Sequence, residues 1–289
     1  MAFQGTKINP KRFDKSQLKF YAFLIPMALF MILPVVYITN QAFKPLDELF
    51  MFPPRFFVIK PTFENFTDLW RTSSTTGVPM TRYLFNSIVA TTATVILSIF
   101  VTAGGAYILS KKKFKAKNWL FSVNQVALMF VPIAVAIPRY LIIKQTGLTD
   151  NFLAHILPML ALPVGLFLVK QFMDQVPDAV IEAARLDGAN DWHILTRIVI
   201  PLVMPALATV GILTFQVSWN ATEASSLYIT NETLKNFAFY LSSLTNASNS
   251  IAGVGMAAAA GLIMFLPNFF IFIMLQSKVM NTMSHSGMK

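Results

Sequence analysis

Carboxylates that could do chemistry stand close together in one polar segment, VPDAVIEAARLDGANDWHILTRIVIP, at residues 176–201. Such groups could bind a metal, exchange protons or pair with a basic partner. The chain has no cysteine and only three histidines, so disulfides, thiolate chemistry and a multi-histidine metal site are not favoured. Asp, His and Ser residues elsewhere are scattered. The segment therefore favours charge pairing at a surface over catalysis.

The same segment carries the start and stop signals of two short helices. Pro177 suits a first helical position, and AVIEAARL is made mostly of strong helix formers. Gly188 can end this helix in the left-handed conformation, and Asp191 is expected to cap a second helix. Pro201 then redirects the chain. The pattern predicts a compact pair of helices.

Small side chains on this pair predict a docking surface. Ala183, Ala184 and Ala189 would let a helix seat deeply against a partner, and Glu182 adds a charge for pairing. A solvated loop with good helix propensity is the alternative. A docking element explains the small residues and the carboxylate together.

Long apolar stretches surround this polar segment and place the chain in a membrane. Hydrophobic residues make up 55% of the sequence and charged residues only 12%, which is too apolar for an ordinary soluble domain. A helix that crosses ~30 Å of hydrocarbon needs about 20 mostly apolar residues. The sequence predicts an all-α membrane protein with six transmembrane helices, at residues 20–42, 83–110, 119–143, 151–173, 202–220 and 253–276.

The distribution of basic residues predicts the orientation of these spans. The net charge is +10, and Lys and Arg gather in residues 1–19 and in the run KKKFKAK at residues 111–117. Because positive residues stay on the cytoplasmic side, both termini are expected inside. The predicted layout is a cytoplasmic basic segment at 1–19, a six-helix membrane domain at 20–276 and a cytoplasmic tail at 277–289.

Two other interpretations of these features are less economical. Nucleic-acid binding would explain the basic runs, but anionic lipid headgroups explain them in a chain that spans the membrane. A signal peptide would explain the first apolar stretch. That stretch is longer than a usual signal core, and no small-x-small cleavage site follows it.

Acidic residues are absent from the interior of the six predicted spans. Proton-coupled carriers usually need a carboxylate within the membrane, and the chain also lacks the G-x-x-x-x-G-K-[ST] motif that binds ATP phosphates. Driven transport would therefore depend on another polypeptide. The alternatives are an ion-coupled secondary transporter of a small polar solute, for which sodium coupling through backbone carbonyls stays open, and a membrane enzyme. His155, in the fourth predicted span, favours a packed or hydrogen-bonded role over a catalytic one.

The spacing within the polar segment resembles a known motif. Glu182-Ala183-Ala184, Gly188 after three further residues, and Ile198-x-Ile200-Pro201 after nine more are similar to the EAA loop, E-A-A-x3-G-x9-I-x-L-P, of binding-protein-dependent ABC importer permeases. Ile200 stands where leucine is usual. The strings FNS, AYILS, LDGA, PLVMPAL and WN resemble the carbohydrate, maltose-permease-like branch. The ending NTMSHSGMK resembles permeases of importers for plant or algal polysaccharide fragments.

This resemblance implies a non-catalytic permease subunit of an ATP-driven importer of sugars or oligosaccharides in the bacterial cytoplasmic membrane. It implies a second homologous permease subunit, two ABC ATPase subunits that carry ATP and Mg, and an extracytoplasmic solute-binding protein. The chain itself would bind no cofactor, metal or nucleic acid. Residues 176–201 would form a cytoplasmic coupling helix between the fourth and fifth spans. The implied ATPase-coupling residues are Glu182, Ala183, Ala184, Leu186, Asp187, Gly188 and Ala189.

Side chains suited to sugar recognition occur in the predicted spans. Sugar sites combine aromatic faces with hydrogen-bonding groups. The candidates for the translocation path are Asn124, Gln125, Tyr140, Gln216, Trp219 and Asn220. Each could equally join helices or anchor the chain at the membrane interface.

Small residues recur in the last span and predict close helix packing. One stripe contains Gly253, Ala257 and Gly261, and a second contains Gly255 and Ala259.

The loop after the fifth predicted span carries an apolar stripe. The i, i+3, i+4, i+7 spacing of Leu234, Phe237, Ala238 and Leu241 predicts a short amphipathic helix against the membrane or the bundle. The tip before it is expected to reach outward freely, and the resemblance implies that it contacts the solute-binding protein. The tip residues are Tyr228, Ile229, Thr230, Asn231, Glu232 and Thr233.

Overall fold

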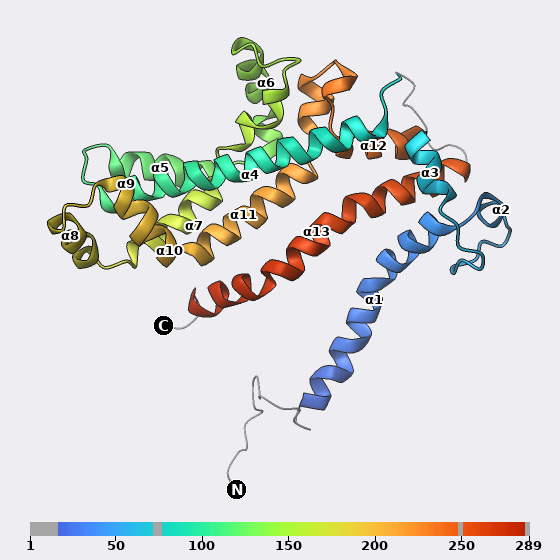
Figure 1. The fold of residues 1–289 in the computed structure, drawn as a ribbon, viewed down its shortest axis with the longest axis horizontal. Helices are drawn as coiled ribbons and strands as arrows, with labels where there is room; N and C mark the ends of the chain where they lie inside the picture. Colours follow the sequence, from blue (N-terminus) through green and yellow to red (C-terminus); the bar gives the residue numbers. More distant parts are fainter. Residues whose placement is uncertain (1–16, 72–76, 248–250, 287–289) are drawn as a thin grey trace, which may run out of the picture. The chain divides into compact units, whose positions relative to one another are not determined.

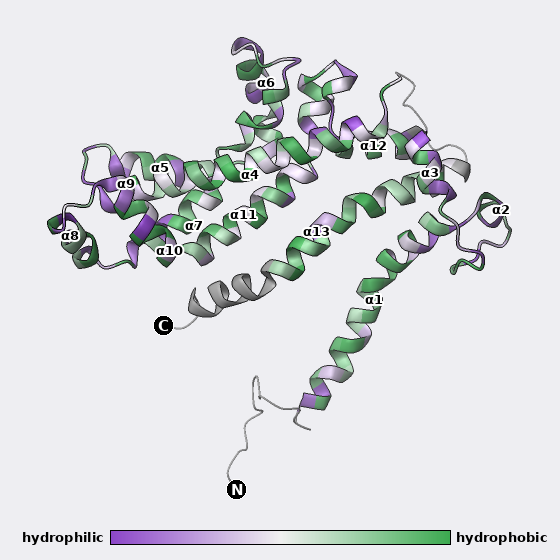
Figure 2. Cartoon of the chain, in the orientation of Figure 1, coloured by the Kyte–Doolittle hydropathy of each residue, from purple (hydrophilic) through white to green (hydrophobic). Residues whose placement is uncertain are grey.

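The computed structural model describes residues 17–71, 77–247 and 251–286, and every regular element in these ranges is a helix (Figure 1). This confirms the predicted all-α class for the described chain. Three helices there are long and apolar enough to cross a membrane, and up to six spans result if each of three bent helix pairs is one span. Figure 2 shows the apolar character of α1 (Leu18–Phe43) along most of its length.

The three long helices correspond to the first, second and sixth predicted spans. They are α1, α4 (Met80–Lys111) and α13 (Ile251–Ser286). Pro26 and Pro34 lie inside α1 and Pro267 lies inside α13, yet both helices continue through these prolines. A proline in an apolar stretch therefore does not break the helix at every position.

The third and fourth predicted spans are broken. The third consists of α5 (Lys117–Ala127), a 3-10 turn and α6 (Ala136–Gln145), and its direction changes by 110°. The fourth begins with short 3-10 turns and continues as α7 (Pro163–Asp174) after a bend of 43°. Val131 and Leu162, the residues before Pro132 and Pro163, are both extended, because proline disfavours helical geometry in the residue that precedes it.

The fifth predicted span begins two residues later than expected, as α11 (Met204–Trp219). It follows α8 (Asp178–Leu186), α9 (Asp191–His193), a π-helical segment (Ile194–Val199) and α10 (Ile200–Leu202). The chain turns by 84° between the helical stretch 191–202 and α11. The bend lies at Val203, between Pro201 and Pro205, in agreement with the predicted change of direction.

Two compact units are present, one made of residues 1–69 and 245–262 and the other of residues 70–244 and 263–289. The core of the second unit lies where α4, α7 and α11 pack together. Ala103, Ala106, Val169 and Val210 are buried in it. Small side chains at these contacts let the helix backbones approach closely.

Hydroxyl groups add polar contacts between α4 and α11. Thr214 Oγ1 donates to Ser98 Oγ, and Ser218 Oγ donates to Thr91 Oγ1, each at 3.4 Å. All four side chains are buried, so these contacts give polar groups a partner within an apolar bundle.

The first unit joins the end of α1 to α3 (Glu64–Arg71) and the start of α13. Asn65 Nδ2 donates to the carbonyl oxygens of Ala42 at 3.0 Å and Lys44 at 2.7 Å. Gly255 of α13 lies against this amide, and a Cβ atom at Gly255 would stand 2.3 Å from Asn65 Oδ1.

The two small-residue stripes of α13 differ in burial. Gly255 and Ala259, the second predicted stripe, are buried, whereas Gly253, Ala257 and Gly261 of the first are only half-buried. The close approach of Asn65 explains why position 255 of the second stripe requires glycine, which has no side chain.

The predicted helix in the loop after α11 begins later than its apolar stripe. The expected amphipathic helix exists as α12 (Phe237–Ala247), but Leu234 belongs to a separate 3-10 turn, Glu232–Leu234. Lys235 is extended between the two. Phe237 and Ala238 are buried, as the stripe predicts.

Replacement of Gly255 by Ala is expected to destabilise the first unit by about 1–3 kcal/mol, the range typical of overpacking. The reason is that Asn65 can move away only by giving up its two hydrogen bonds. Thermal unfolding in detergent measures the effect. Gly261→Ala is the matched control, because its new Cβ would meet Ile38 Cγ2 at an ordinary 3.9 Å. Equal melting temperatures for the two variants would contradict this account.

Candidate functional site

The helix α8 has one face toward its own bundle and one face outward. Ile181 and Ala184 are buried in the same apolar cluster as α4, α7 and α11. Glu182, Ala183 and Leu186 are exposed, and Leu186 is 90% exposed. Ala184 therefore supports the seat of the helix, while the exposed face presents a carboxylate beside an apolar side chain.

Gly188 ends α8 in the left-handed conformation, as predicted, with φ +83°. Its amide donates to the Arg185 carbonyl at 3.0 Å, and the Ala189 amide donates to the Ala184 carbonyl at 2.9 Å. This pair of bonds defines a Schellman cap. A Cβ atom at Gly188 would have no neighbour within 4 Å, so backbone conformation rather than space requires glycine there.

The caps of the two short helices differ from the prediction by one residue. Pro177 is the N-cap of α8 rather than its first helical residue. Asn190, not Asp191, caps α9, because its side chain accepts a hydrogen bond from the His193 amide at 2.8 Å. Asp191 lies in the first helical turn, and its carboxylate is free to bond elsewhere.

The carboxylate of Asp191 joins α9 to the end of α4. It accepts hydrogen bonds from Lys112 Nζ at 2.5 Å and from the Tyr107 hydroxyl at 3.3 Å. Arg185 Nη2 lies 3.6 Å away. The hydrogen bond from Lys112 is the main reason that the pKa of Asp191 lies below its ordinary value.

The neighbouring lysine of α4 joins the start of the polar segment. Lys111 Nζ donates to the Val176 carbonyl at 2.6 Å and to Asp178 Oδ1 at 2.8 Å. Only 6% of the Lys111 side chain is exposed. The hydrogen bond from Lys111 lowers the pKa of Asp178, so the last residue of α4 and its C-cap Lys112 hold both helices of the segment.

These contacts change the interpretation of the basic run at 111–117. The run was expected to contact anionic lipid headgroups. Lys111 and Lys112 instead pair with Asp178 and Asp191 of the same chain. Sequence reasoning missed these pairs because 67 and 79 residues separate the partners, and no local spacing links residues so far apart.

The six translocation-path candidates do not form one site in the described structure. Trp219 is 3% exposed, and its indole N–H donates to the Met264 carbonyl at 2.9 Å. Asn124 Nδ2 donates to the Pro163 carbonyl at 3.2 Å. These two side chains therefore join helices. The exposed candidates are Gln125, Tyr140, Gln216 and Asn220.

A charged cluster lies where the third predicted span meets the loop after α11. Arg139 Nη1 lies 2.9 Å and 3.2 Å from the two carboxylate oxygens of Glu223, and the Tyr228 hydroxyl donates to Glu223 at 2.6 Å. Burial and the nearby Glu223 carboxylate raise the pKa of Tyr228. Sequence reasoning missed Arg139, although a lone cation in an apolar span is a recognisable signal.

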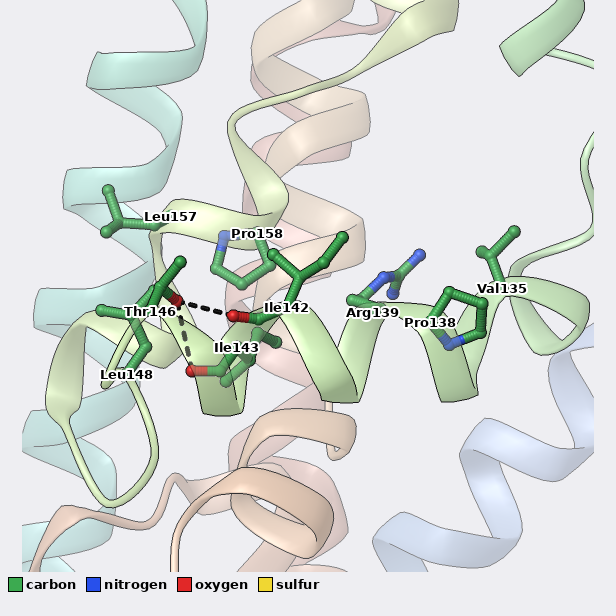
Figure 3. A pocket seen from close by; sticks show the side chains of 9 residues that line it. All are labelled: Val135, Pro138, Arg139, Ile142, Ile143, Thr146, Leu148, Leu157 and Pro158. Carbon is green, nitrogen blue, oxygen red and sulfur yellow. Dashed lines mark hydrogen bonds between the residues drawn. The ribbon is translucent and has the colours of Figure 1, made fainter.

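Figure 3 shows the pocket beside Arg139, which has a volume of about 420 Å³. Apart from this arginine and Thr146, its lining is apolar. The Thr146 hydroxyl donates to the carbonyls of Ile142 and Ile143 within its own helix. The lining residues are Val135, Pro138, Arg139, Ile142, Ile143, Thr146, Leu148, Leu157 and Pro158. In the described chain no group of three His, Cys, Asp or Glu side chains could hold a metal ion.

The tip at residues 228–233 is not free, contrary to expectation. Tyr228 and Ile229 are buried. The Asp150 carboxylate accepts hydrogen bonds from the amides of Thr230 at 3.0 Å and Asn231 at 2.7 Å. The Asn231 amide in particular lowers the pKa of Asp150. What remains exposed is Thr230, Asn231 and Thr233, with Glu232 half-buried.

His155 also contacts this part of the chain. Its ring Nε2 lies 3.0 Å from the Leu234 carbonyl, and the residue is buried. The geometry agrees with the predicted packed and hydrogen-bonded role.

Comparisons with known proteins agree with this geometry. Residues 95–277 match the family model of the binding-protein-dependent transport system inner membrane component. An inner membrane ABC transporter permease protein of Escherichia coli (strain K12), YcjP, is 27% identical over 281 residues, which cover 96% of this chain and 99% of that protein. A polygalacturonan/rhamnogalacturonan transport system permease protein of Bacillus subtilis (strain 168), YtcP, is 29% identical over 209 residues, 72% of this chain and 71% of that protein.

The fold is similar to that of a solved structure. One chain of a bacterial ABC transporter involved in the import of the acidic polysaccharide alginate superposes with a TM-score of 0.78 and 21% identity. The superposition covers 93% of this chain and 99% of that chain. At this identity the likeness concerns the fold.

Replacement of Asp191 by Asn is expected to loosen the polar segment, because Lys112 and Arg185 lose a charged partner. Hydrogen exchange of the amides in residues 189–199 should become faster. Asp187→Asn is the matched control, since no ion pair of Asp187 occurs within the described chain. Because the pKa of Asp191 is lowered, protection should persist above the ordinary carboxyl pKa of about 3.9 and disappear as the pH falls below it. Unchanged exchange in Asp191→Asn would contradict this role.

Proposed function

Because this chain belongs to the family of binding-protein-dependent transport system inner membrane components, we propose that it is a permease subunit of an ATP-driven ABC importer for sugars or oligosaccharides. It contributes half of the translocation pathway and no covalent chemistry. The observation that carries the proposal is the polar segment within the matched region, whose helix α8 buries one face in the bundle and presents Glu182 and Leu186 outward.

The substrate class rests on the relatives. The Bacillus subtilis relative is a polygalacturonan/rhamnogalacturonan transport system permease protein, and a Streptomyces coelicolor relative is a diacetylchitobiose uptake system permease protein. Saccharides, including fragments of polysaccharides, are the chemistry that these names share. We assign the same class to this chain.

The assembly we propose has four kinds of component. This chain pairs with a second homologous permease subunit, two ABC ATPase subunits dock from the cytoplasm and carry ATP and Mg, and an extracytoplasmic solute-binding protein delivers the substrate. Each bent helix pair counts as one span, which gives six spans with both termini inside. Residues 1–19 and 277–289 are the cytoplasmic ends, and residues 20–276 form the membrane domain.

Coupling begins at the exposed face of α8. Glu182, Ala183, Leu186 and Asp187 contact the ATPase, and the Gly188 turn and Ala189 set the angle of the next helix. When the ATPase subunits close, α8 and α9 move as one body, because Asp191 and the buried Ile181 and Ala184 fix them to the same core.

Two routes carry that motion into the membrane. One is the 84° bend at Val203, which leads into α11. The other is the pair of ionic contacts from Lys111 and Lys112, which leads into α4. The end of α4 therefore receives the displacement directly from the docking segment.

On the opposite side we propose that the solute-binding protein contacts the exposed residues Thr230, Asn231 and Thr233. Asp150 supports this contact, because its carboxylate fixes the backbone of Thr230 and Asn231. The surface is thus preorganised, which lowers the entropy cost of binding.

Replacement of Glu182 by Lys is expected to abolish ATP-driven uptake in vesicles. The reason is that the new positive charge has the wrong sign for the ATPase surface that we propose pairs with the Glu182 carboxylate. Gly188→Ala should reduce uptake less severely, since a left-handed alanine costs only about 1–2 kcal/mol. Insertion of both variants into the membrane should remain normal. Asp68→Lys, a charge reversal on the exposed face of α3, is the control.

Two outcomes would overturn the assignment. Full ATP-driven uptake by Glu182→Lys would remove α8 from the coupling path. Uptake that needs an ion gradient and no ATP would favour the secondary carrier instead.

The proposed topology places Lys115 inside and Asn231 outside. The absence of native cysteine allows single cysteines at these positions to be labelled with a membrane-impermeant reagent in intact cells. Cysteine at 231 should react, cysteine at 115 should not, and added solute-binding protein should protect position 231. Labelling at 115 would contradict the topology, and unprotected reaction at 231 would contradict the contact.

A further inference from the structure

The segment between α1 and α3 buries two of its charged side chains, Lys44 and Glu48. Lys44 is only 2% exposed, and its Nζ donates to the Arg55 carbonyl. The Glu48 carboxylate, also buried, accepts hydrogen bonds from the amides of Ile59 at 3.1 Å and Lys60 at 2.8 Å. The Ile59 amide is the main cause that holds the pKa of Glu48 below its usual value.

Further backbone groups of this segment also find partners inside it. The Val58 amide donates to Asn40 Oδ1 at 3.0 Å, and the Thr62 amide donates to the Phe43 carbonyl at 2.9 Å. Asn65 satisfies the carbonyls of Ala42 and Lys44. These polar backbone groups need no water, so the segment can enter a medium of low polarity at little cost.

The outer surface of the segment is aromatic. We name the apolar side chains at positions 50, 52, 57, 59 and 63 the aromatic loop. Phe52 is 95% exposed, and the other members are also exposed: Phe50, Phe57, Ile59 and Phe63. Five large apolar side chains exposed within one short segment are unfavourable in water and indicate an interaction site.

Figure 1 shows the segment directly after the end of α1. The 26 residues of α1, at a rise of ~1.5 Å each, place its ends about 39 Å apart. That length exceeds the ~30 Å hydrocarbon core, so a helix that crosses the core carries its last turn to the headgroup level. No residue in the apolar window of α1 is buried within the described chain, and the aromatic loop follows this exposed apolar helix in the sequence.

We propose that the aromatic loop inserts into the headgroup region of the outer leaflet and anchors the first span there. The composition agrees, because aromatic side chains together with exposed Arg55 and Lys60 are typical of the membrane interface. Lys44 and Glu48 fold the loop so that its apolar side chains face outward beside Arg55 and Lys60. The assignment to the outer leaflet rests on the proposed topology.

The experiment uses a nitroxide spin label on a single cysteine at Phe52 or Phe57, in the assembled transporter in phosphatidylethanolamine–phosphatidylglycerol vesicles. Collisions with oxygen report apolar surroundings, and collisions with a water-soluble nickel chelate report aqueous ones. Phe30→Cys, in the middle of α1, is the hydrocarbon reference, and Asn231→Cys, measured before the solute-binding protein is added, is the aqueous reference. Both reference positions are exposed.

The oxygen-to-nickel collision ratio at positions 52 and 57 should lie below that at position 30 and above that at position 231. A ratio equal to that at position 231 would overturn the proposal. So would an immobilised label that neither reagent reaches, because the loop would then contact a protein subunit. The same vesicles report ATP-driven uptake, so failure of the proposed transport function is scored separately from failure of insertion.

Discussion

A bilayer offers no water to an unpaired amide or carbonyl, and this constraint organises the described chain. Two of its six apolar stretches are broken and a third follows a sharp bend, and polar side chains supply partners to backbone carbonyls. Asn124 donates to the carbonyl at the start of α7, and His155 contacts the Leu234 carbonyl. The Trp219 indole N–H donates to the Met264 carbonyl of α13. Polar residues in an apolar segment are therefore as much structural as functional here.

The same constraint explains why sequence could predict some features and not others. Hydropathy identified the apolar stretches, and helix signals identified α8 and its Gly188 turn, because these depend on residues that are near one another in the chain. Proline could not identify the breaks, since Pro26 and Pro267 lie inside unbroken helices whereas Pro132 and Pro163 begin new ones. The presence of proline alone therefore does not distinguish a continuous helix from a break.

Long-range pairing limited the prediction of the candidate site in the same way. Asn190 caps α9, whereas the Asp191 carboxylate accepts a hydrogen bond from Lys112, a residue 79 positions away. The tip after α11 is held by Asp150, across a similar distance in sequence. In each case an aspartate takes a partner that only the folded chain provides.

The two ionic contacts between α4 and the polar segment differ in exposure, and this has a consequence for their response to salt. Lys111 is almost completely covered, whereas Lys112 and Asp191 are 34% and 54% exposed. Dissolved ions screen exposed charges over about 8 Å at physiological ionic strength and over ~3 Å at 1 M, but screen buried charges far less. Rising ionic strength weakens both ion pairs, since Asp178 is itself 75% exposed, but α8 keeps the hydrogen bond from Lys111 to the Val176 carbonyl and its buried side chains Ile181 and Ala184. The polar segment would then remain seated at its first helix while its second helix becomes loose, so the ionic strength of the surrounding solution bears unequally on the two ends of one small motif.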